Sequence, residues 1–273
     1  MRSVSTGRCR DQTGQPIAHF GRTAMNFRLL VQYDGTEFHG WQIQNELRTV
    51  QGELTRVLSL LDSRDVHVHG SGRTDAGVHA QGQVANVHLE RDIAPEKLRN
   101  AINGNLAADV RVLSVDIVPD DFHARYSAKS KTYHYRLVHG QVLSPFWARY
   151  AHQETRRLDI ERMRTVARMF IGEHDWTAFS GADSDSESRV RNVSQLEISS
   201  RYDERGHCDL IEFTVSANGF LRYMVRSIIG TLLAVGRGEI DESTVQRAIE
   251  EGERSLAGAT APAHGLTLVN VEY

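Results

Sequence analysis

The segment Gly72–His79 places a carboxylate, Asp75, two residues from a guanidinium, Arg73, between two predicted strands. A carboxylate near a guanidinium favours its ionised form, and an ionised carboxylate can act as a nucleophile or a base. The segment also suits a hairpin connection, because two glycines, a threonine and an aspartate are typical of turns. The segment alone therefore favours a turn, and a catalytic Asp75 requires partners elsewhere in the chain.

Three further segments carry side chains that suit RNA. Trp41 beside Gln42 and Gln44 could stack on a base and contact its edge, although this segment also fits a turn closed by an aromatic residue. Phe122–Arg125 and Lys129–Tyr135 interleave cations with rings, which suits phosphates and bases. The alternative for these two segments is a strand whose alternate residues are merely exposed.

Two arginines stand four residues apart in an otherwise apolar segment, Phe220–Val235, which is predicted to form a helix. Arginine is rarely buried without a partner, so Arg222 and Arg226 need a carboxylate, an anionic ligand or a place at the surface where their side chains reach water. The functional interpretation pairs one of them with a catalytic carboxylate.

The histidines His67, His69, His79 and His88 are the candidates for a metal site, and the first two would share one face of a strand. No cysteine or carboxylate completes a familiar ligand set around them. We therefore predict no metal site.

The composition limits the classes of protein to which the chain can belong. The chain has 273 residues, of which 40% are hydrophobic and 25% charged, as in ordinary globular proteins. It has no apolar run long enough to span a membrane. Two cysteines, Cys9 and Cys208, make no disulfide framework, so a reducing cytoplasm is expected. The net charge is only −3, but residues 121–170 are basic and the region after Gly238 is acidic, which fits a polyanion on one side or simply solvated helix faces.

Residues 26–126 show the order β-α-β-β-α-β, the split pattern of ferredoxin-like folds. Thr49 is a plausible N-cap for the first helix, and Pro95 suits the first turn of the second. The predicted strands are Asn26–Tyr33, Val66–Gly70, Gln83–Leu89 and Val110–Val118, and the helices run along Val50–Leu61 and from Pro95 through Ile102.

Residues 127–273 repeat this order less regularly. The predicted strands are Thr132–Val138, Val193–Ser199, Asp209–Ser216 and Leu266–Val271, and the predicted helices are Leu158–Ile171, Phe220–Val235 and Glu242–Glu250. The polar segment Gly181–Ser188 is expected to be a mobile loop. Residues 1–25 are predicted to be a disordered extension, with Met25 as a candidate natural start. The predicted fold is α+β, with two ferredoxin-like (RRM-like) halves whose antiparallel sheets join across a central catalytic cleft.

With these motifs in this order, the chain resembles the family of bacterial tRNA pseudouridine synthase A over residues 26–273. The motifs that carry the resemblance are Tyr33-Asp34-Gly35-Thr36, Gly40-Trp41-Gln42-x-Gln44, Thr49-Val50-Gln51, Gly72 to Ala80, Phe122-His123-Ala124-Arg125, Met224-Val225-Arg226 and Ala261-Pro262-Ala263-x-Gly265-Leu266.

The resemblance implies a cytoplasmic, cofactor-free homodimer that converts uridine to pseudouridine at positions 38, 39 and 40 of the tRNA anticodon stem-loop, gripping one tRNA across both subunits. It implies that Asp75 is the essential carboxylate, acting as nucleophile or base, and that Arg226 is its ion-pair partner. By the same resemblance, Tyr133 packs near the substrate uridine, and Arg73 displaces the target base and takes its place in the stack.

Two positions depart from the family pattern: Ala107 stands where proline is usual, and Asn192 where threonine is usual. Both lie away from Asp75 in the sequence, so they affect the expected loop geometry and not the chemistry. Two rival functions remain at this stage. One is a non-catalytic RNA-binding protein, because ferredoxin-like sheets often bind RNA without chemistry. The other is a metal-dependent hydrolase built on the histidines.

Overall fold

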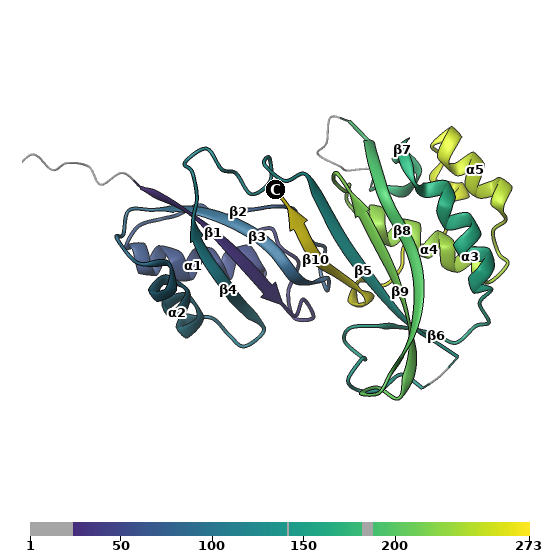
Figure 1. The fold of residues 1–273 in the computed structure, drawn as a ribbon, viewed down its shortest axis with the longest axis horizontal. Helices are drawn as coiled ribbons and strands as arrows, with labels where there is room; N and C mark the ends of the chain where they lie inside the picture. The colour runs from purple at the N-terminus through teal and green to yellow at the C-terminus, as the bar shows by residue number, and fades with distance from the viewer. Residues whose placement is uncertain (1–23, 141, 182–187) are drawn as a thin grey trace, which may run out of the picture.

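A computed structural model describes residues 24–140, 142–181 and 188–273, and arranges them around one long sheet (Figure 1). Most of the predicted extension and of the predicted loop Gly181–Ser188 lies outside the described residues. The strands are β1 Met25–Tyr33, β2 His69–Gly70, β3 His79–Leu89, β4 Val110–Ile117, β5 Ser130–His139, β6 His152–Glu154, β7 Gly172–Asp175, β8 Val190–Asp203, β9 Cys208–Ala217 and β10 Leu266–Glu272. The helices are α1 Val50–Asp62, α2 Pro95–Asn105, α3 Ile160–Ala167, α4 Met224–Gly236 and α5 Glu242–Glu251.

The first part of the chain follows the predicted order, β1-α1-β2-β3-α2-β4. The hydroxyl of Thr49 accepts a hydrogen bond from the Gly52 amide at 3.3 Å, which confirms the predicted cap of α1. Leu54 and Leu58, one turn apart on this helix, are fully buried against the sheet. Strand β2 is shorter than predicted, because only its last two residues pair with β3.

The second part confirms the predicted strands β5, β8, β9 and β10 and contains two short strands, β6 and β7, that were not predicted. The predicted helix Leu158–Ile171 is divided into α3 and a single 3₁₀ turn. The predicted helix from Phe220 begins only at Met224, because Tyr223 has a left-handed backbone with φ of 64°. The prediction that Arg222 lies on this helix was therefore wrong.

The two parts share one continuous sheet, with the strand order β4-β1-β3-β10-β5-β9-β8-β7. The two predicted antiparallel sheets join through β10, which runs parallel to β3 and antiparallel to β5. Gly82 on β3 permits this approach, since a Cβ there would lie 2.3 Å from the carbonyl oxygen of Val269. The last strand of the chain thus joins the first half of the sheet to the second (Figure 1).

The helices form two groups along the sheet, with α1 and α2 against its first part and α3, α4 and α5 against its second (Figure 1). A single cluster of buried apolar side chains extends through both parts, from Phe27 on β1 to Val271 on β10. Helix α4 is buried along almost its whole length, apart from Arg226. Within the described ranges, no helix is both long and apolar enough to cross a membrane.

Candidate active site

A cavity of about 1100 Å³ lies where the two parts of the sheet meet, and we call it the Asp75 cavity. Its volume slightly exceeds the range of about 300–1,000 Å³ that is usual for drug-sized ligands. Asp75 is the only carboxylate among the described residues that line it. The cations that line it come from both parts of the chain: Arg73, Arg125, Lys131, Arg191, Arg222 and Arg226.

The loop that carries Asp75 is anchored to the protein core through the buried residue Thr74. The Thr74 hydroxyl shares a hydrogen bond of 2.8 Å with the hydroxyl of Tyr33, and its carbonyl oxygen accepts the Trp41 amide at 3.1 Å. Gly40 permits this contact, because it has a φ of 88° and a Cβ there would lie 2.5 Å from the Thr74 oxygen. The side chain of Asp75, which follows, is only 21% exposed and reaches the cavity.

Gln83 on β3 fixes the preceding turn of the same loop. Its amide nitrogen donates to the carbonyl oxygen of Gly72 at 3.0 Å, and its amide oxygen accepts from the Ser71 hydroxyl at 2.7 Å. Burial raises the pKa of Tyr33 to about 12, so this hydroxyl remains a neutral hydrogen-bonding group. These buried contacts orient Asp75 before any ligand arrives.

Arg226 is the ion-pair partner of Asp75, with 2.9 Å between its Nη1 and the carboxylate Oδ2. The two side chains are 16% and 21% exposed, so solvent screens the pair only in part. Arg226 Nε donates to the carbonyl oxygen of Ala261 at 2.8 Å, and the Ala261 amide donates back to the Arg226 carbonyl at 3.0 Å. The guanidinium of Arg226 therefore links the carboxylate of Asp75 to the chain segment before β10. The other carboxylate oxygen of Asp75, Oδ1, accepts no hydrogen bond from a described residue.

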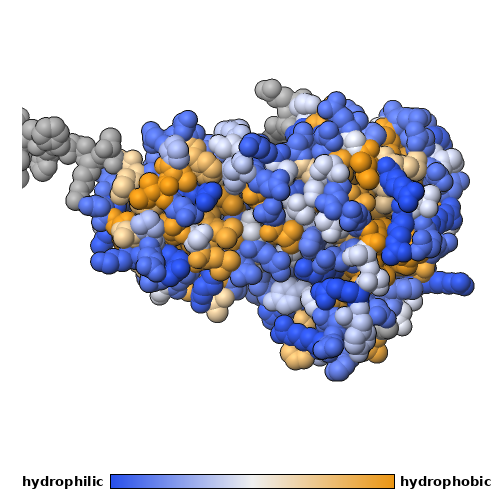
Figure 2. Space-filling view, in the orientation of Figure 1, coloured by the Kyte–Doolittle hydropathy of each residue, from blue (hydrophilic) through white to orange (hydrophobic). Residues whose placement is uncertain are grey.

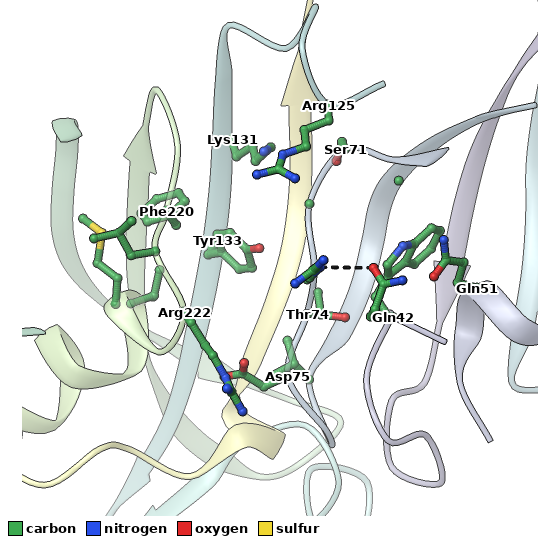
Figure 3. Close-up of a pocket in the computed structure, with 18 of the residues that line it drawn as sticks. Gln42, Gln51, Ser71, Thr74, Asp75, Arg125, Lys131, Tyr133, Phe220 and Arg222 are labelled. Carbon is green, nitrogen blue, oxygen red and sulfur yellow. Dashed lines mark hydrogen bonds between the residues drawn. The ribbon is translucent and has the colours of Figure 1, made fainter. Parts of the chain in front are cut away.

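Arg73 does not contact Asp75, although it is closer in sequence. Its Nε donates to the side-chain oxygen of Gln42 at 3.1 Å, at an exposed edge of the cavity (the dashed line in Figure 3). The suggestion from the sequence that Arg73 is the guanidinium beside the carboxylate was wrong, and Arg226 has that place.

Tyr133 on β5 lies at the middle of the cavity wall, between Lys131 and Asp75 (Figure 3). The residue is 6% exposed, and its ring packs edge to face on Phe220 with 5.1 Å between centroids. Burial, and then the nearby Tyr33 and Asp75, raise the pKa of Tyr133 far above its ordinary value. Its hydroxyl, which has no hydrogen-bond partner among the described residues, is thus a neutral phenol that can contact a ligand.

Trp41 is a core residue and not an exposed stacking platform. It is 2% exposed, and Gly70 lies so close that a Cβ there would approach the indole ring to 2.4 Å. The sequence-based interpretation that Trp41 stacks on a base was therefore wrong, although both Trp41 and Gln42 line the cavity.

The four histidines lie in different places, with His88 paired with Asp120 at 3.0 Å. The rings of His67 and His69 lie 4.4 Å apart at the cavity wall, whereas His79 is buried and accepts the Gly35 amide on Nδ1 at 2.9 Å. Burial lowers the pKa of His79, which favours the neutral ring that this acceptor role requires. In the part of the chain that the structure describes, no three potential ligands gather as a metal site.

The sequence indicated Lys131 only as part of the segment Lys129–Tyr135, and it gave no indication of Arg191, yet both line the cavity. Burial, together with the charges of Arg125 and Arg191, lowers the pKa of Lys131 to about 8. The signal for Lys131 was its position two residues before Tyr133 on a predicted strand, because alternate residues share a face. Arg191 had no such signal, since its place depends on how β8 packs beside β9.

The chain is similar over most of its length to known proteins. A family model described as tRNA pseudouridine synthase matches residues 29–127 and 166–273. A Solibacter usitatus protein named tRNA pseudouridine synthase A is 43% identical over 249 residues, which cover 90% of this chain and 98% of that protein. A Bacillus cereus protein named tRNA pseudouridine synthase A 2 is 38% identical over 249 residues, covering 91% of this chain and 99% of that protein.

Among solved structures, a Cbf5-Nop10-Gar1 complex aligns with 98% of this chain and 55% of the matched chain, at 15% identity and a TM-score of 0.36. That score is too low to indicate a shared fold.

Proposed function

This chain belongs to the tRNA pseudouridine synthase family, whose enzymes convert uridine to pseudouridine in tRNA, and we propose that Asp75 is the carboxylate that performs the conversion. We further propose that the substrates are the uridines at positions 38, 39 and 40 of the anticodon stem-loop. The observation that carries the assignment of Asp75 is its place as the only described carboxylate in a cavity lined by cations, held against Arg226 at 2.9 Å.

The reaction is an isomerisation, which is why one well-placed carboxylate can suffice. The bond between uracil N1 and ribose C1′ breaks, the base turns, and a bond forms between C5 and C1′. The proton on C5 leaves and N1 gains one, so no atom is added or lost overall. The balance requires no oxidant, reductant or second substrate.

Asp75 acts as an anion in each of three routes: attack on C1′, removal of the proton at C2′, or attack on C6 of the ring. Arg226 supplies the opposite charge beside it and fixes its direction, because the guanidinium is itself tied to the Ala261 carbonyl. The Oδ1 atom of Asp75, which accepts no hydrogen bond from a described residue, is the atom offered to the ribose or base. Preorganised charges of this kind stabilise the charge that develops during a reaction.

Tyr133 contributes as a neutral phenol that packs beside the uridine and donates a hydrogen bond to it. Burial raises its pKa, so Tyr133 is a neutral phenol at neutral pH and a poor base for the C5 proton.

Arg73 lies at the exposed edge of the cavity, where an extruded base would pass. Taking a uridine out of its stack costs a few kcal/mol, which a side chain inserted into the vacated place can offset. We assign this role to Arg73, with Gln42 holding the guanidinium in the absence of RNA.

The strand order supports a division into two ferredoxin-like halves, 26–126 and 127–273, which build the catalytic cleft together. In the first half, β1 lies between β4 and β3, and β2 pairs with the other edge of β3. This is the arrangement expected of the split β-α-β pattern. Asp75 and Arg73 come from the first half, and Tyr133 and Arg226 from the second.

We also propose that the enzyme is a cytoplasmic homodimer in which one tRNA contacts both subunits. Apolar side chains gather over β1 and β4 in the view of Figure 2. Two apolar residues of β4, Leu113 and Ile117, are 43% and 55% exposed. Exposed apolar patches of this kind mark interaction surfaces. Sedimentation of the protein at micromolar concentration tests the proposal, and a monomer that binds tRNA with full affinity contradicts it.

Mapping pseudouridine in tRNA before and after incubation with the purified protein tests the proposed function. We expect new pseudouridine at positions 38, 39 and 40 wherever the substrate has uridine there. Tight tRNA binding without any new pseudouridine would identify a non-catalytic RNA-binding protein instead. Pseudouridine only outside the anticodon arm would retain the chemistry and refute the positions.

A further inference from the structure

Three cations lie together at the end of the Asp75 cavity away from Asp75. Lys131 and Arg125 stand side by side there, with Tyr133 between them and Asp75 (Figure 3). Arg191, from β8, lies close enough for its charge to act on Lys131. The two charges that lower the pKa of the lysine are both positive, so Lys131 is a cation held among cations.

The amine of Lys131 has no hydrogen-bond or ion-pair partner among the described residues. A partly buried ammonium without a partner is unfavourable, because it loses hydration and gains nothing in return. Gly72 provides the space for it, since a Cβ at that position would lie 3.3 Å from Nζ. The unpartnered ammonium of Lys131 therefore lowers the stability of the folded protein. Groups with such strongly shifted pKa values are common at functional sites.

The two guanidiniums beside Lys131 each contact a neutral group. Arg191 donates to the carbonyl oxygens of Ser188 and Val190, at 3.0 and 2.6 Å. Arg125 lies over the ring of Tyr126, with 5.7 Å from Cζ to the ring centroid. The only described carboxylate that lines the cavity is paired with Arg226, so no described carboxylate of the cavity offsets the charge of Lys131.

The position of the cluster relative to Tyr133 indicates which part of a nucleic acid it would meet. Residues 131 and 133 alternate on β5 and so face the same side, about 7 Å apart along the strand. A nucleotide whose base lies beside Tyr133 therefore extends its sugar and phosphate along the cavity. Phosphate oxygens are multivalent acceptors that suit a lysine flanked by two arginines.

We propose that Lys131, Arg125 and Arg191 form a phosphate subsite, which binds a backbone phosphodiester flanking the target uridine and so sets the position of that nucleotide relative to Asp75. This inference rests on the proposed function for the identity of the RNA, and it adds a subsite with Lys131 at its centre. Because phosphates carry no sequence information, the subsite fixes the register of the backbone and does not select the base.

The salt dependence of tRNA binding tests the subsite. The logarithm of the affinity falls as the logarithm of the salt concentration rises. Replacing a lysine that contacts a phosphate reduces the steepness of this fall by about 0.9. We expect this decrease, with affinity about tenfold weaker at low salt, for Lys131→Gln, and a nearly unchanged slope for Lys131→Arg. The matched control is Lys97→Gln, because Lys97 is exposed on α2 and does not line the cavity. An unchanged slope in Lys131→Gln, or an equal decrease in Lys97→Gln, overturns the proposal.

Chemical labelling of the unmodified protein gives a second test that does not depend on a variant folding. An amine reagent at pH 8 should modify Lys131 readily in the free protein, and saturating tRNA should protect it at least about tenfold more than Lys97. Equal protection of both lysines, or none at Lys131, contradicts the subsite. Both tests measure binding, so they can succeed or fail whether or not the protein forms pseudouridine, which the mapping experiment decides separately.

Discussion

At the scale of single residues, the proposed role of Arg226 depends on two hydrogen bonds as well as on its charge. One nitrogen binds Asp75 and another binds the Ala261 carbonyl, at 2.9 and 2.8 Å. A lysine has one compact ammonium and cannot reproduce this planar arrangement. We expect Arg226→Lys to slow isomerisation by about 100-fold, measured by single-turnover tritium release from tRNA labelled at uridine C5.

The control for Arg226→Lys is Arg168→Lys, because Arg168 is exposed and does not line the Asp75 cavity. A single-turnover rate within about twofold of the unmodified protein for Arg226→Lys would show that the two contacts are not needed for the chemistry.

Lys131 predicts a pH-dependent stability. Its pKa is lowered from the ordinary lysine value of 10.5 to about 8 in the folded protein, so folding disfavours its charged form. The penalty is complete below pH 8 and disappears as the pH rises from about 8 through 10.5, where the unfolded lysine also loses its charge. We expect Lys131→Met to raise the free energy of unfolding by about 1–3 kcal/mol at pH 7, measured by urea denaturation.

The advantage of Lys131→Met should shrink steadily between pH 8 and 10.5 as the unmodified protein gains stability. A difference between the two proteins that stays constant over this interval would mean that the amine is not held at a lowered pKa. Lys97→Met, which changes an exposed lysine, should show no such pH dependence.

The residues of the site differ in how far the sequence could identify them. The loop Gly72–His79 was compatible with a plain turn, and the resemblance to a family led to the expectation that Asp75 and Arg226 pair. The structure shows that pair, but it also shows that Arg73 contacts Gln42 and that Trp41 is buried. These outcomes depend on which side of a loop faces the core, and residue type alone does not determine that.

At the scale of elements, the packing of α4 places Arg226. A Cβ at Gly230 would lie 1.7 Å from the carbonyl oxygen of Ala259, so helix and segment touch backbone to backbone just before Ala261. We expect Gly230→Ala to push them apart, to destabilise the protein by about 3 kcal/mol in urea denaturation and to slow isomerisation through the displaced Arg226.

The matched control for Gly230→Ala is Gly104→Ala in α2, where a Cβ would meet nothing within 4 Å. Because alanine favours a helix over glycine, this control should be neutral or stabilising by about 0.5–1 kcal/mol. If Gly230→Ala is as stable and active as the control, the close contact is not what positions Arg226.

Long elements were predictable and short or strained ones were not. Helix α1 follows from its apolar spacing and from Thr49, which supplies the expected cap. The start of α4 was missed because Tyr223 takes a left-handed conformation that sequence patterns assign to glycine or asparagine. Strands β6 and β7 have three and four residues, too few to show an alternating pattern.

At the scale of the whole molecule, the Asp75 cavity is lined by residues of both halves, so it depends on how the halves are joined. Strand β10 lies between β3 and β5, and Asp34 in the first half accepts a hydrogen bond from the Tyr150 hydroxyl in the second at 2.9 Å. The sequence predicted the long elements and a cleft between halves. It could not predict the parallel pairing of β10 with β3, because such pairing joins distant segments and leaves no local pattern.

The central claim, that Asp75 performs the isomerisation across this junction, is tested most directly by tritium release from C5-labelled tRNA with Asp75→Asn. The substitution keeps the shape of the side chain and removes its charge. We predict that the unmodified protein releases tritium, whereas Asp75→Asn releases none above the protein-free control while its affinity for tRNA stays within about threefold. Clear turnover by Asp75→Asn would contradict the claim.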